Sequence, residues 1–249
     1  RSEMKDKFGE VFTPEELIEE MMNKLREIDP SVFKNPHLRW LDPANGTGNF
    51  PMVVFEMLND GLKDYNKGGL DLRDEKTRKN HIIKNMLYMV ELQPDNVLVS
   101  QKIFGKDANI FCGSFLSPDN KSINPDIATK FGVEKYDIII GNPPFQTPKQ
   151  TDVGTTSGKG VLWSLFTKES LKILKNTESY LCFLHPPPWR GLGKDKLIKE
   201  LCHDKQLHFL KIFNIDDSKY YFGIGSKFDI YILQNKPKYK NTQILIKQN

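Results

Sequence analysis

The sequence has few cysteines. Cys112, Cys182 and Cys202 are the only three, and they lie far apart along the chain. An odd number of distant cysteines does not match the paired framework of a small secreted domain. We therefore expect reduced thiols and a cytoplasmic location.

Long apolar runs are also missing, because Lys, Glu or Asn interrupts each hydrophobic stretch well before the length that crosses a bilayer. No charged segment followed by an apolar one opens the chain, so the sequence lacks the pattern of a secretory leader. We expect no membrane partner. Because the first residue is Arg1 rather than Met, we also expect the chain to be a processed product or part of something longer.

An excess of charge of one sign is absent as well. The 36 Lys and Arg residues against 32 Asp and Glu residues leave a formal net charge of +4. This surplus is compatible with a polyanionic substrate but is also ordinary for a lysine-rich protein, so charge alone does not predict nucleic acid binding. With 249 residues, 38% of them hydrophobic, we predict a single domain with a helical segment over 1–30 and a core over 38–249.

Short apolar runs alternate with helical patterns along the chain. Strands are predicted at 38–42, 86–91, 110–112, 136–140, 180–185, 208–215 and 228–234. Helices are predicted at 49–58, 95–104, 162–174 and 194–202, after a first helix with Thr13 at its N-cap and Pro14 as its first residue. This alternation predicts an α/β fold with a doubly wound, mostly parallel sheet of seven strands. The segments 61–79 and 117–134 are predicted to be a polar surface insertion and a loop-like connector.

The first predicted strand ends in a glycine-containing turn, Asp42-Pro43-Ala44-Asn45-Gly46-Thr47-Gly48-Asn49-Phe50. Ligands of such sheets bind at the carboxyl ends of the strands, and glycine lets them approach the backbone. The turn has neither the further glycine of a dinucleotide fingerprint nor the ending of a Walker loop, so phosphate is not the expected ligand. A simple turn between a strand and a helix would also explain these glycines.

Glu91 ends the second predicted strand, where nucleotide-binding units place an acid that accepts both ribose hydroxyls. A solvated charge would also explain this residue by itself.

The fourth predicted strand runs directly into Asn142-Pro143-Pro144-Phe145. The Asn142 side-chain oxygen and the Pro143 carbonyl are two acceptors that can converge on one NH2 group, and Phe145 adds a flat apolar face. An aryl amine is a poor nucleophile, but two acceptors that hold its hydrogens localise its lone pair toward a sulfonium methyl. The motif therefore predicts amino-group methylation, whereas a rigid Asn-Pro turn would explain only the prolines.

With these motifs, nearly the whole chain resembles the catalytic domain of the adenine-N6 DNA methyltransferases of restriction–modification systems, in the gamma motif order. The segment 9–14 resembles the family's N-terminal cofactor motif. The resemblance implies a Rossmann-like class I fold, S-adenosylmethionine as cofactor, and methyl transfer to a flipped-out adenine of DNA without a covalent intermediate. It implies catalytic roles for Asn142, Pro143, Pro144 and Phe145, and cofactor contacts from Phe12, Thr13, Asp42, Ala44, Asn45, Gly46, Gly48, Phe50, Glu91, Leu92, Ser114 and Phe115.

Some positions depart from the family pattern. Asn45 and Thr47 stand where Cys and Ser are common, and Ser114 stands where an aspartate usually receives the cofactor's adenine amino group. Because a hydroxyl can accept the same hydrogen bond without a charge, the departure at Ser114 concerns cofactor affinity rather than reaction type. In this family a separate domain that usually follows the last strand recognises the DNA sequence. The chain ends almost there, so we expect recognition by a domain or subunit outside it.

Several alternatives remain open from the sequence. The acceptor is alternatively an RNA amino group or a protein glutamine, although Phe145 and the Phe12-Thr13-Pro14 element favour a nucleobase. A non-catalytic subunit that binds DNA without turnover is a further alternative, which the intact motif at Asn142 disfavours.

Three other features carry weaker expectations. Trp189 and Arg190 are predicted on the substrate side, where Trp189 either contacts DNA or caps the core. The stretch 146–160 is predicted to order over bound substrate. Cys202, His203 and His208 lack paired ligand spacing, so we predict no metal.

Overall fold

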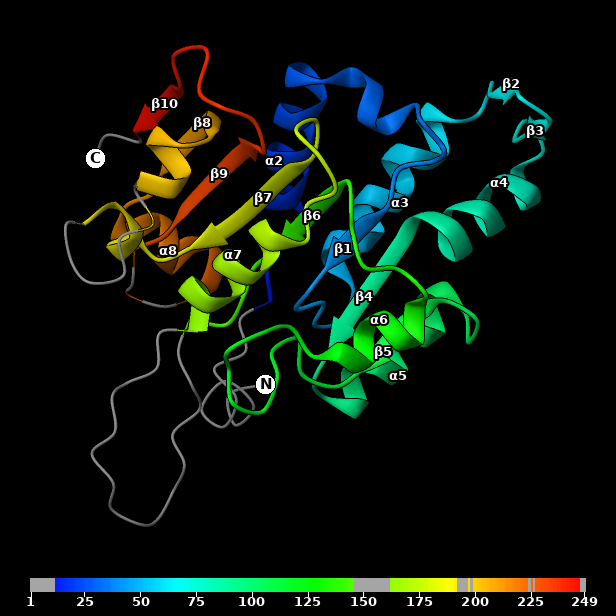
Figure 1. The fold of residues 1–249 in the computed structure, drawn as a ribbon, viewed down its shortest axis with the longest axis horizontal. Helices are drawn as coiled ribbons and strands as arrows, with labels where there is room; N and C mark the ends of the chain where they lie inside the picture. Colours follow the sequence, from blue (N-terminus) through cyan, green and yellow to red (C-terminus); the bar gives the residue numbers. More distant parts are fainter. Residues whose placement is uncertain are drawn as a thin grey trace.

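An eight-stranded sheet with helices on both faces forms the centre of the computed structural model, which describes residues 12–145, 162–191, 197, 199–223, 225 and 227–246 (Figure 1). The spatial order of the strands is β10-β8-β9-β7-β6-β1-β4-β5. In chain order they are β1 (Trp40–Asp42), β4 (Leu87–Glu91), β5 (Asn109–Cys112), β6 (Ile138–Gly141), β7 (Tyr180–His185), β8 (Gln206–Ile212), β9 (Asp229–Gln234) and β10 (Gln243–Ile246).

All neighbouring strands of this sheet pair in parallel except β9, which is antiparallel to both β7 and β8. Every residue of β4, β6, β7 and β9 is buried, as expected for strands covered by helices on both faces. The α/β prediction is confirmed, but the prediction of seven strands is wrong by one. The extra strand, β10, lies at the sheet edge and all four of its residues are exposed, so no burial pattern marks it in the sequence.

Side chains of successive strand residues point to opposite faces and build two apolar clusters. Trp40 and Ile138 belong to the cluster under α2 (Glu15–Ile28), α3 (Asn49–Gly61), α5 (Pro94–Phe104) and α8 (Ile215–Phe222). Leu41 and Ile139 belong to the cluster under α6 (Pro125–Phe131), α7 (Leu162–Lys172), η3 (Pro187–Arg190) and η4 (Lys199–His203). In the described parts of the chain, none of the helices is long and apolar enough to cross a membrane.

The first helix begins differently from the prediction. Leu17, Met21 and Leu25 form its buried apolar face. Helix α2 starts at Glu15 with Pro14 at the N-cap, and no side chain among the described residues caps it. The Thr13 hydroxyl, predicted to cap the helix, instead accepts a hydrogen bond from Asn142. Acidic residues at Glu15 and Glu16 compensate in part, because negative charge near a helix N-terminus is favourable.

The segment 61–79 is not only a surface insertion, which corrects the prediction. It holds the hairpin of β2 (Asn66–Lys67) and β3 (Leu70–Asp71) and the start of α4 (Glu75–His81). Leu72 is fully buried, and the buried Arg78 guanidinium donates to the Leu72 and Arg73 carbonyl oxygens. Leu72 and Arg78 therefore anchor the hairpin in the core. The prediction missed them because the rest of the segment is polar.

Three further boundaries differ from the prediction. The connector at 117–134 contains α6, and its residue Ile127 is buried in the core. The strand predicted to reach Ile215 ends at Ile212, because Asn214 and Asp217 form a capping box that starts α8. Of the helix predicted at 194–202, the structure describes only the π-helical turn η4 and the isolated position 197. The remaining short elements are η1 (Pro30–Phe33) and the π-helical turn η2 (Ile82–Met86).

Candidate functional site

The carboxyl ends of β1, β4 and β6 bring the predicted site residues together. Strand β1 pairs in parallel with β4 on one side and with β6 on the other. Asp42 and Glu91 are the last residues of β1 and β4, and Asn142 directly follows β6. The three residues therefore lie together at the carboxyl ends of adjacent strands, a place called the strand edge below. The chain order reverses at this point of the sheet, since β4 and β5 lie on one side of β1 and β6 and β7 lie on the other. Such a switch point is where doubly wound sheets bind ligands.

The glycine turn after β1 is held against the end of β4. The backbone N–H of Asn45 donates to the Val90 carbonyl at 2.9 Å, and the backbone N–H of Gly46 donates to Oε2 of Glu91 at 2.7 Å. Gly46 and Gly48 have φ values of 57° and 95°, in the left-handed region that glycine adopts without strain. A Cβ at Gly48 would also lie 3.1 Å from the Phe104 ring, so this turn needs glycine for space as well as conformation.

Glu91 has a structural task that the sequence did not indicate. Besides the Gly46 amide, its carboxylate accepts from the Gln93 amide at 2.7 Å, and its side chain is buried. Asn96 Nδ2 also donates to Oε1 of Glu91 at 3.5 Å, so at least three residues hold this carboxylate in place. Glu91 thus fixes the glycine turn in the same place where it was predicted to accept ribose hydroxyls.

Asp42, the last residue of β1, has a buried carboxyl group, and only 1% of the residue is exposed. Its Oδ1 accepts from the Ala44 amide at 3.0 Å, whereas Oδ2 has no hydrogen-bond partner among the described residues. Burial raises the pKa of the Asp42 carboxyl to about 8, the Ala44 hydrogen bond opposes this, and the nearby Glu91 charge adds to it. The carboxyl is therefore mostly protonated at neutral pH.

Unpartnered acceptors gather at this edge. Within the described residues, Asp42 Oδ2, Asn45 Oδ1 and Asn142 Oδ1 are buried without a hydrogen-bond donor, and the only other such side-chain oxygen is the Ser170 hydroxyl on α7. The other end of the Asn142 amide is occupied, because Nδ2 donates to Thr13 Oγ1 at 3.1 Å. Buried acceptors in native proteins are nearly always satisfied, so three of them at one strand edge indicate a ligand that donates hydrogen bonds.

Close packing and aromatic rings frame these acceptors. Gly141 has a φ of 146°, and a Cβ there would lie 2.8 Å from Asp42 Oδ1, so only glycine lets β6 approach Asp42 this closely. Phe12 is 42% exposed, and its ring would lie 3.9 Å from a Cβ on Gly46. Phe145 is half-buried against the core. The edge therefore combines polar acceptors with two aromatic surfaces that remain partly open.

The remaining predicted residues differ in exposure. Phe50 is buried in one apolar cluster and Phe115 in the other, so both pack in the core behind the strand ends. Leu92 is 60% exposed, and Ala44 and Pro144 are half-buried, whereas Pro143 is buried. Ser114 is exposed in the loop after β5, and its hydroxyl oxygen accepts from the Leu116 amide at 3.2 Å. The predicted motif positions 9–11 and the stretch 146–160 lie outside the described residues.

Trp189 belongs to the core, which decides the alternative left open by the sequence. Its ring is fully buried, and Nε1 donates to Asp229 Oδ2 at 2.7 Å. Arg190 Nε donates to the same oxygen at 2.7 Å. Burial raises the pKa of the Asp229 carboxyl, and the Arg190 guanidinium opposes that rise. Asp229 was not identified from the sequence, since it stands 39 residues after Arg190 at the start of a strand.

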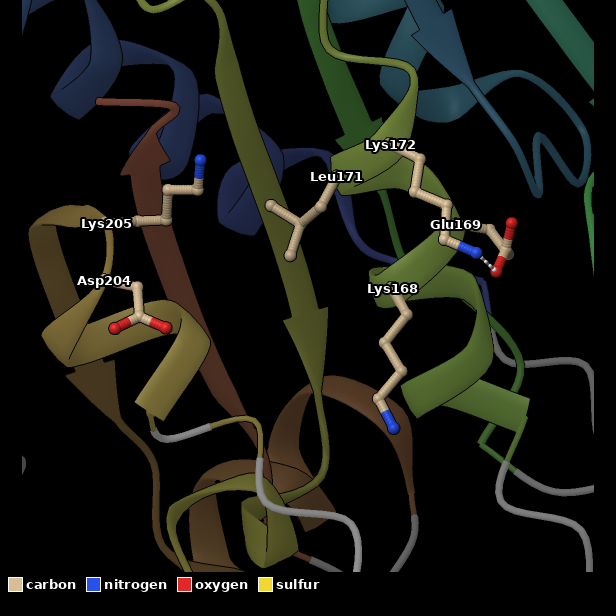
Figure 2. A pocket seen from close by; sticks show the side chains of 6 residues that line it. All are labelled: Lys168, Glu169, Leu171, Lys172, Asp204 and Lys205. Carbon is tan, nitrogen blue, oxygen red and sulfur yellow. Dashed lines mark hydrogen bonds and ion pairs between the residues drawn. The ribbon is translucent and has the colours of Figure 1, made fainter. Parts of the chain in front are cut away.

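A shallow pocket of about 400 Å³ lies elsewhere, between α7 and the start of β8 (Figure 2). Its lining carries charges of both signs, and Lys172 Nζ pairs with Glu169 at 2.6 Å. It contains none of the predicted site residues; its lining is Lys168, Glu169, Leu171, Lys172, Asp204 and Lys205. In the ranges that the structure describes, no group of three or more His, Cys, Asp or Glu side chains is placed to hold a metal ion.

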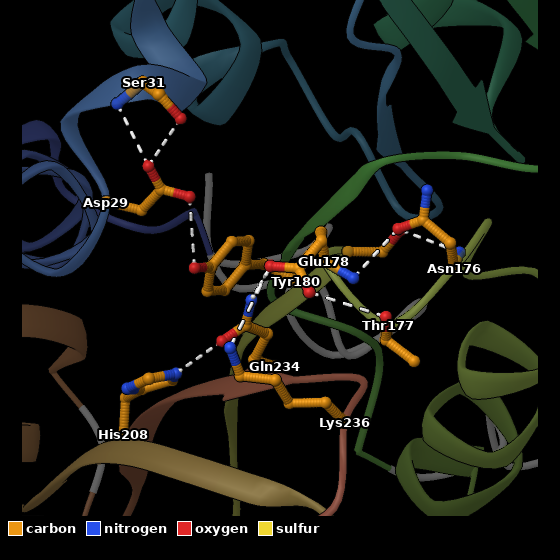
Figure 3. Close-up of polar contacts among 10 residues, drawn as sticks. Asp29, Ser31, Asn176, Thr177, Glu178, Tyr180, His208, Gln234 and Lys236 are labelled. Carbon is orange, nitrogen blue, oxygen red and sulfur yellow. Dashed lines mark hydrogen bonds and ion pairs between the residues drawn. The ribbon is translucent and has the colours of Figure 1, made fainter.

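A polar network lies at the other ends of the central strands, away from the predicted site residues (Figure 3). Tyr180 donates to Asp29 Oδ2 at 3.2 Å, which ties the start of β7 to the end of α2. Gln234 contacts His208 Nε2 at 2.9 Å and donates to Glu178 at 3.0 Å. These contacts join the start of β7 and the first half of β8 to the last residue of β9, so we assign this network to stability rather than to ligand binding.

Comparison with known proteins agrees with this geometry. The model of the Eco57I restriction-modification methylase family matches residues 61–222. An uncharacterized adenine-specific methylase of Mycoplasma pneumoniae (strain ATCC 29342 / M129 / Subtype 1) is 26% identical over 267 residues, covering 77% of this chain and 61% of that protein.

Solved structures show the same fold. The M protein of the type I restriction enzyme EcoKI matches with a TM-score of 0.64 and 16% identity, over 91% of this chain and 45% of that protein. A Listeria monocytogenes protein described as a class I S-adenosylmethionine-dependent methyltransferase matches with a TM-score of 0.58 and 16% identity, over 94% of this chain and 65% of that protein. The predicted class I, Rossmann-like fold is thus confirmed, and the chain spans less than two thirds of each of these proteins.

Proposed function

Since the chain belongs to the Eco57I restriction-modification methylase family, we propose that it is an S-adenosylmethionine-dependent methyltransferase domain that methylates the N6 amino group of adenine in DNA. The observation that carries this proposal is the Asn142 amide, which stands at the carboxyl end of β6 with its oxygen buried and without a partner in the described parts of the chain. That oxygen and the Pro143 carbonyl are the pair of acceptors that an amino group needs.

The cofactor fits the side of the edge formed by β1 and β4. Asp42 Oδ2 and Asn45 Oδ1 are acceptors without donors among the described residues. The Glu91 carboxylate accepts the ribose hydroxyls in this proposal. When bound, S-adenosylmethionine supplies a methyl group on a positively charged sulfur. A carboxyl that can ionise beside a cation is suited to hold it, and Gly46 and Gly48 let the ligand approach the backbone. Contacts from Phe12, Thr13, Ala44, Phe50, Leu92, Ser114 and Phe115 complete the proposed cofactor site.

The substrate amine lies on the β6 side in this proposal. Asn142 Oδ1 and the Pro143 carbonyl accept its two hydrogens, so the nitrogen lone pair is localised and directed at the methyl group. Phe145 stacks on the base, and Pro144 keeps the backbone of the motif rigid. A base inside a duplex cannot reach such an edge, so the adenine is flipped out before transfer.

Adenine of DNA is the favoured substrate because the matching family consists of restriction-modification methylases and the mycoplasma relative is described as adenine-specific. A restriction–modification enzyme must also select a DNA sequence. Because the chain spans 61% of that relative and 45% of the EcoKI M protein, we propose that a further domain or subunit supplies this recognition. The described cysteines are free thiols, which suits a cytoplasmic location beside the DNA.

The proposal is tested by transfer of labelled methyl from S-adenosylmethionine to mixed genomic DNA, with total RNA and a glutamine-containing protein as parallel acceptors. Nucleoside analysis that finds N6-methyladenine in the DNA supports the proposal. Label found only in RNA or in protein overturns it. A chain that binds the cofactor but transfers no label, alone and together with its recognition partner, is instead a non-catalytic subunit. Asn142→Ala serves as the negative control for background label.

Ser114→Asp is expected to tighten cofactor binding. An aspartate in the loop after β5 accepts the cofactor's adenine amino group through a charge-assisted hydrogen bond, which is roughly twice as strong as a neutral one. We expect the Kd for S-adenosylmethionine to fall by about 3- to 10-fold, a change on the order of 1 kcal/mol. Isothermal titration measures it, with Asn80→Asp as a control that adds the same charge on exposed surface at the end of α4. An equal change in both variants would mean that Ser114 does not face the cofactor.

A further inference from the structure

Thr13 connects the cofactor side of the strand edge to the Asn142 amide. From its contacts we infer that Thr13 is a positioning residue, whose hydroxyl holds Asn142 so that the amide oxygen faces the substrate amine. This inference rests on the proposed function and adds a task for Thr13 beyond contact with the cofactor.

The contacts of Thr13 place it between two asparagines. Its Oγ1 accepts from Asn142 Nδ2 at 3.1 Å, and its carbonyl oxygen accepts from Asn49 Nδ2 at 2.9 Å. Asn49 is the first residue of α3, directly after the glycine turn. Only 5% of Thr13 is exposed, so these bonds are protected from competing water. A residue from before α2 thereby joins the turn after β1 to the motif after β6.

The Thr13 hydroxyl is not used for the helix that follows it. A threonine ahead of Pro14-Glu15-Glu16 has the pattern of an N-cap, yet α2 has Pro14 at its N-cap and no capping bond from a described side chain. Capping side chains stabilise helices measurably, so the sequence forgoes a favourable contact here. The hydroxyl points to Asn142 instead, which indicates that the orientation of this amide matters more than the start of α2.

The orientation of Asn142 matters because the two ends of an amide differ in chemistry. The NH2 end donates hydrogen bonds and the oxygen end accepts them, although the two ends have nearly the same shape. Only the oxygen can hold a hydrogen of the substrate amine. In this structure the Thr13 bond occupies the NH2 end, and Oδ1 stays buried and without a partner among the described residues. Without the hydroxyl, the amide can rotate and present a donor to the amine.

Thr13→Val removes the hydroxyl and keeps the shape, and Thr13→Ser restores the hydroxyl. At saturating cofactor we expect kcat of Thr13→Val to fall by about 10- to 100-fold, since a misplaced catalytic group costs rates of this order. The Kd for S-adenosylmethionine should change by a smaller factor, and Thr13→Ser should recover most of kcat. Thr129→Val, on the exposed surface of α6, is the matched control. A kcat unchanged in Thr13→Val, or lost equally in Thr13→Ser, overturns the inference.

A second readout does not depend on activity. The side-chain NH2 signals of Asn142 in a 15N-labelled chain, assigned with Asn142→Ala, should shift in Thr13→Val and return in Thr13→Ser. Unshifted signals would show that the bond is absent, whatever the enzyme methylates. Shifted signals with no turnover in the wild type would contradict the proposed function and leave the Thr13–Asn142 bond established. Thermal melting of each variant checks that the fold is retained.

Discussion

Asn142→Ala should lower kcat for methyl transfer by at least roughly 100- to 1,000-fold, the loss typical of removing one preorganised hydrogen-bonding group from a reacting centre. The alanine leaves only the Pro143 carbonyl to hold the amine, so the nitrogen lone pair stays delocalised into the ring. In the structure the Asn142 side chain hydrogen-bonds to Thr13, whereas the hydrogen bonds given for Asp42 and Glu91 involve the Ala44 and Gly46 amides. Binding of S-adenosylmethionine should therefore change little.

Single-turnover transfer of labelled methyl gives the rate, and isothermal titration gives the cofactor Kd. Asn142→Asp is an informative companion, because it keeps an acceptor on the amine while it loses the donor to Thr13. We expect it to retain more activity than the alanine variant. If Asn142→Ala turns over at the wild-type rate, the amine is not held by this residue and the proposed mechanism fails. If cofactor binding collapses as well, Asn142 belongs to the cofactor site instead.

The parts of the fold that the sequence predicted are those with a strong local signal. Strand β7 was predicted at 180–185 with the bounds that the structure shows, because six consecutive residues are buried on both faces. The predicted range of strand β8 is too long at its end, because Phe213 and Ile215 continue the apolar run past Ile212. Asn214 and Asp217 mark the start of α8 three residues apart, a capping signal that outweighs the apolar run.

The convergence of Asp42, Glu91 and Asn142 was also predictable, because parallel strands end at the same edge of a sheet. The contacts that hold these residues were not. The bond from Gly46 to Glu91 spans 45 residues and the bond from Asn142 to Thr13 spans 129. Both depend on which groups the folded backbone brings within hydrogen-bond distance, and no local pattern encodes that. Thr13 was misassigned for this reason, since its local pattern indicates a helix cap.

Asp42→Asn should weaken binding of S-adenosylmethionine and remove most of its pH dependence. Burial raises the pKa of the Asp42 carboxyl to about 8, so most wild-type molecules carry a proton there at neutral pH. A positively charged cofactor favours the ionised carboxyl, and the proton must therefore leave as the cofactor binds. Affinity of the wild type should then rise by up to about tenfold per pH unit until the pKa is passed. Asparagine cannot ionise, so its affinity should stay low and nearly flat.

The same ionisation predicts a stability effect with a definite sign. Asp42 ionises near its ordinary pKa of 3.8 in the unfolded chain but holds its proton to about 8 in the folded one. Between these values the folded state binds more protons, so the contribution of Asp42 to the free energy of unfolding falls as pH rises. Urea unfolding should show Asp42→Asn gaining stability relative to wild type at about pH 8 compared with about pH 5. Titration of the cofactor in buffers of different ionisation enthalpy measures the released proton. Equal heats in all buffers, with parallel stability curves, would mean that Asp42 is already ionised in the folded protein without cofactor.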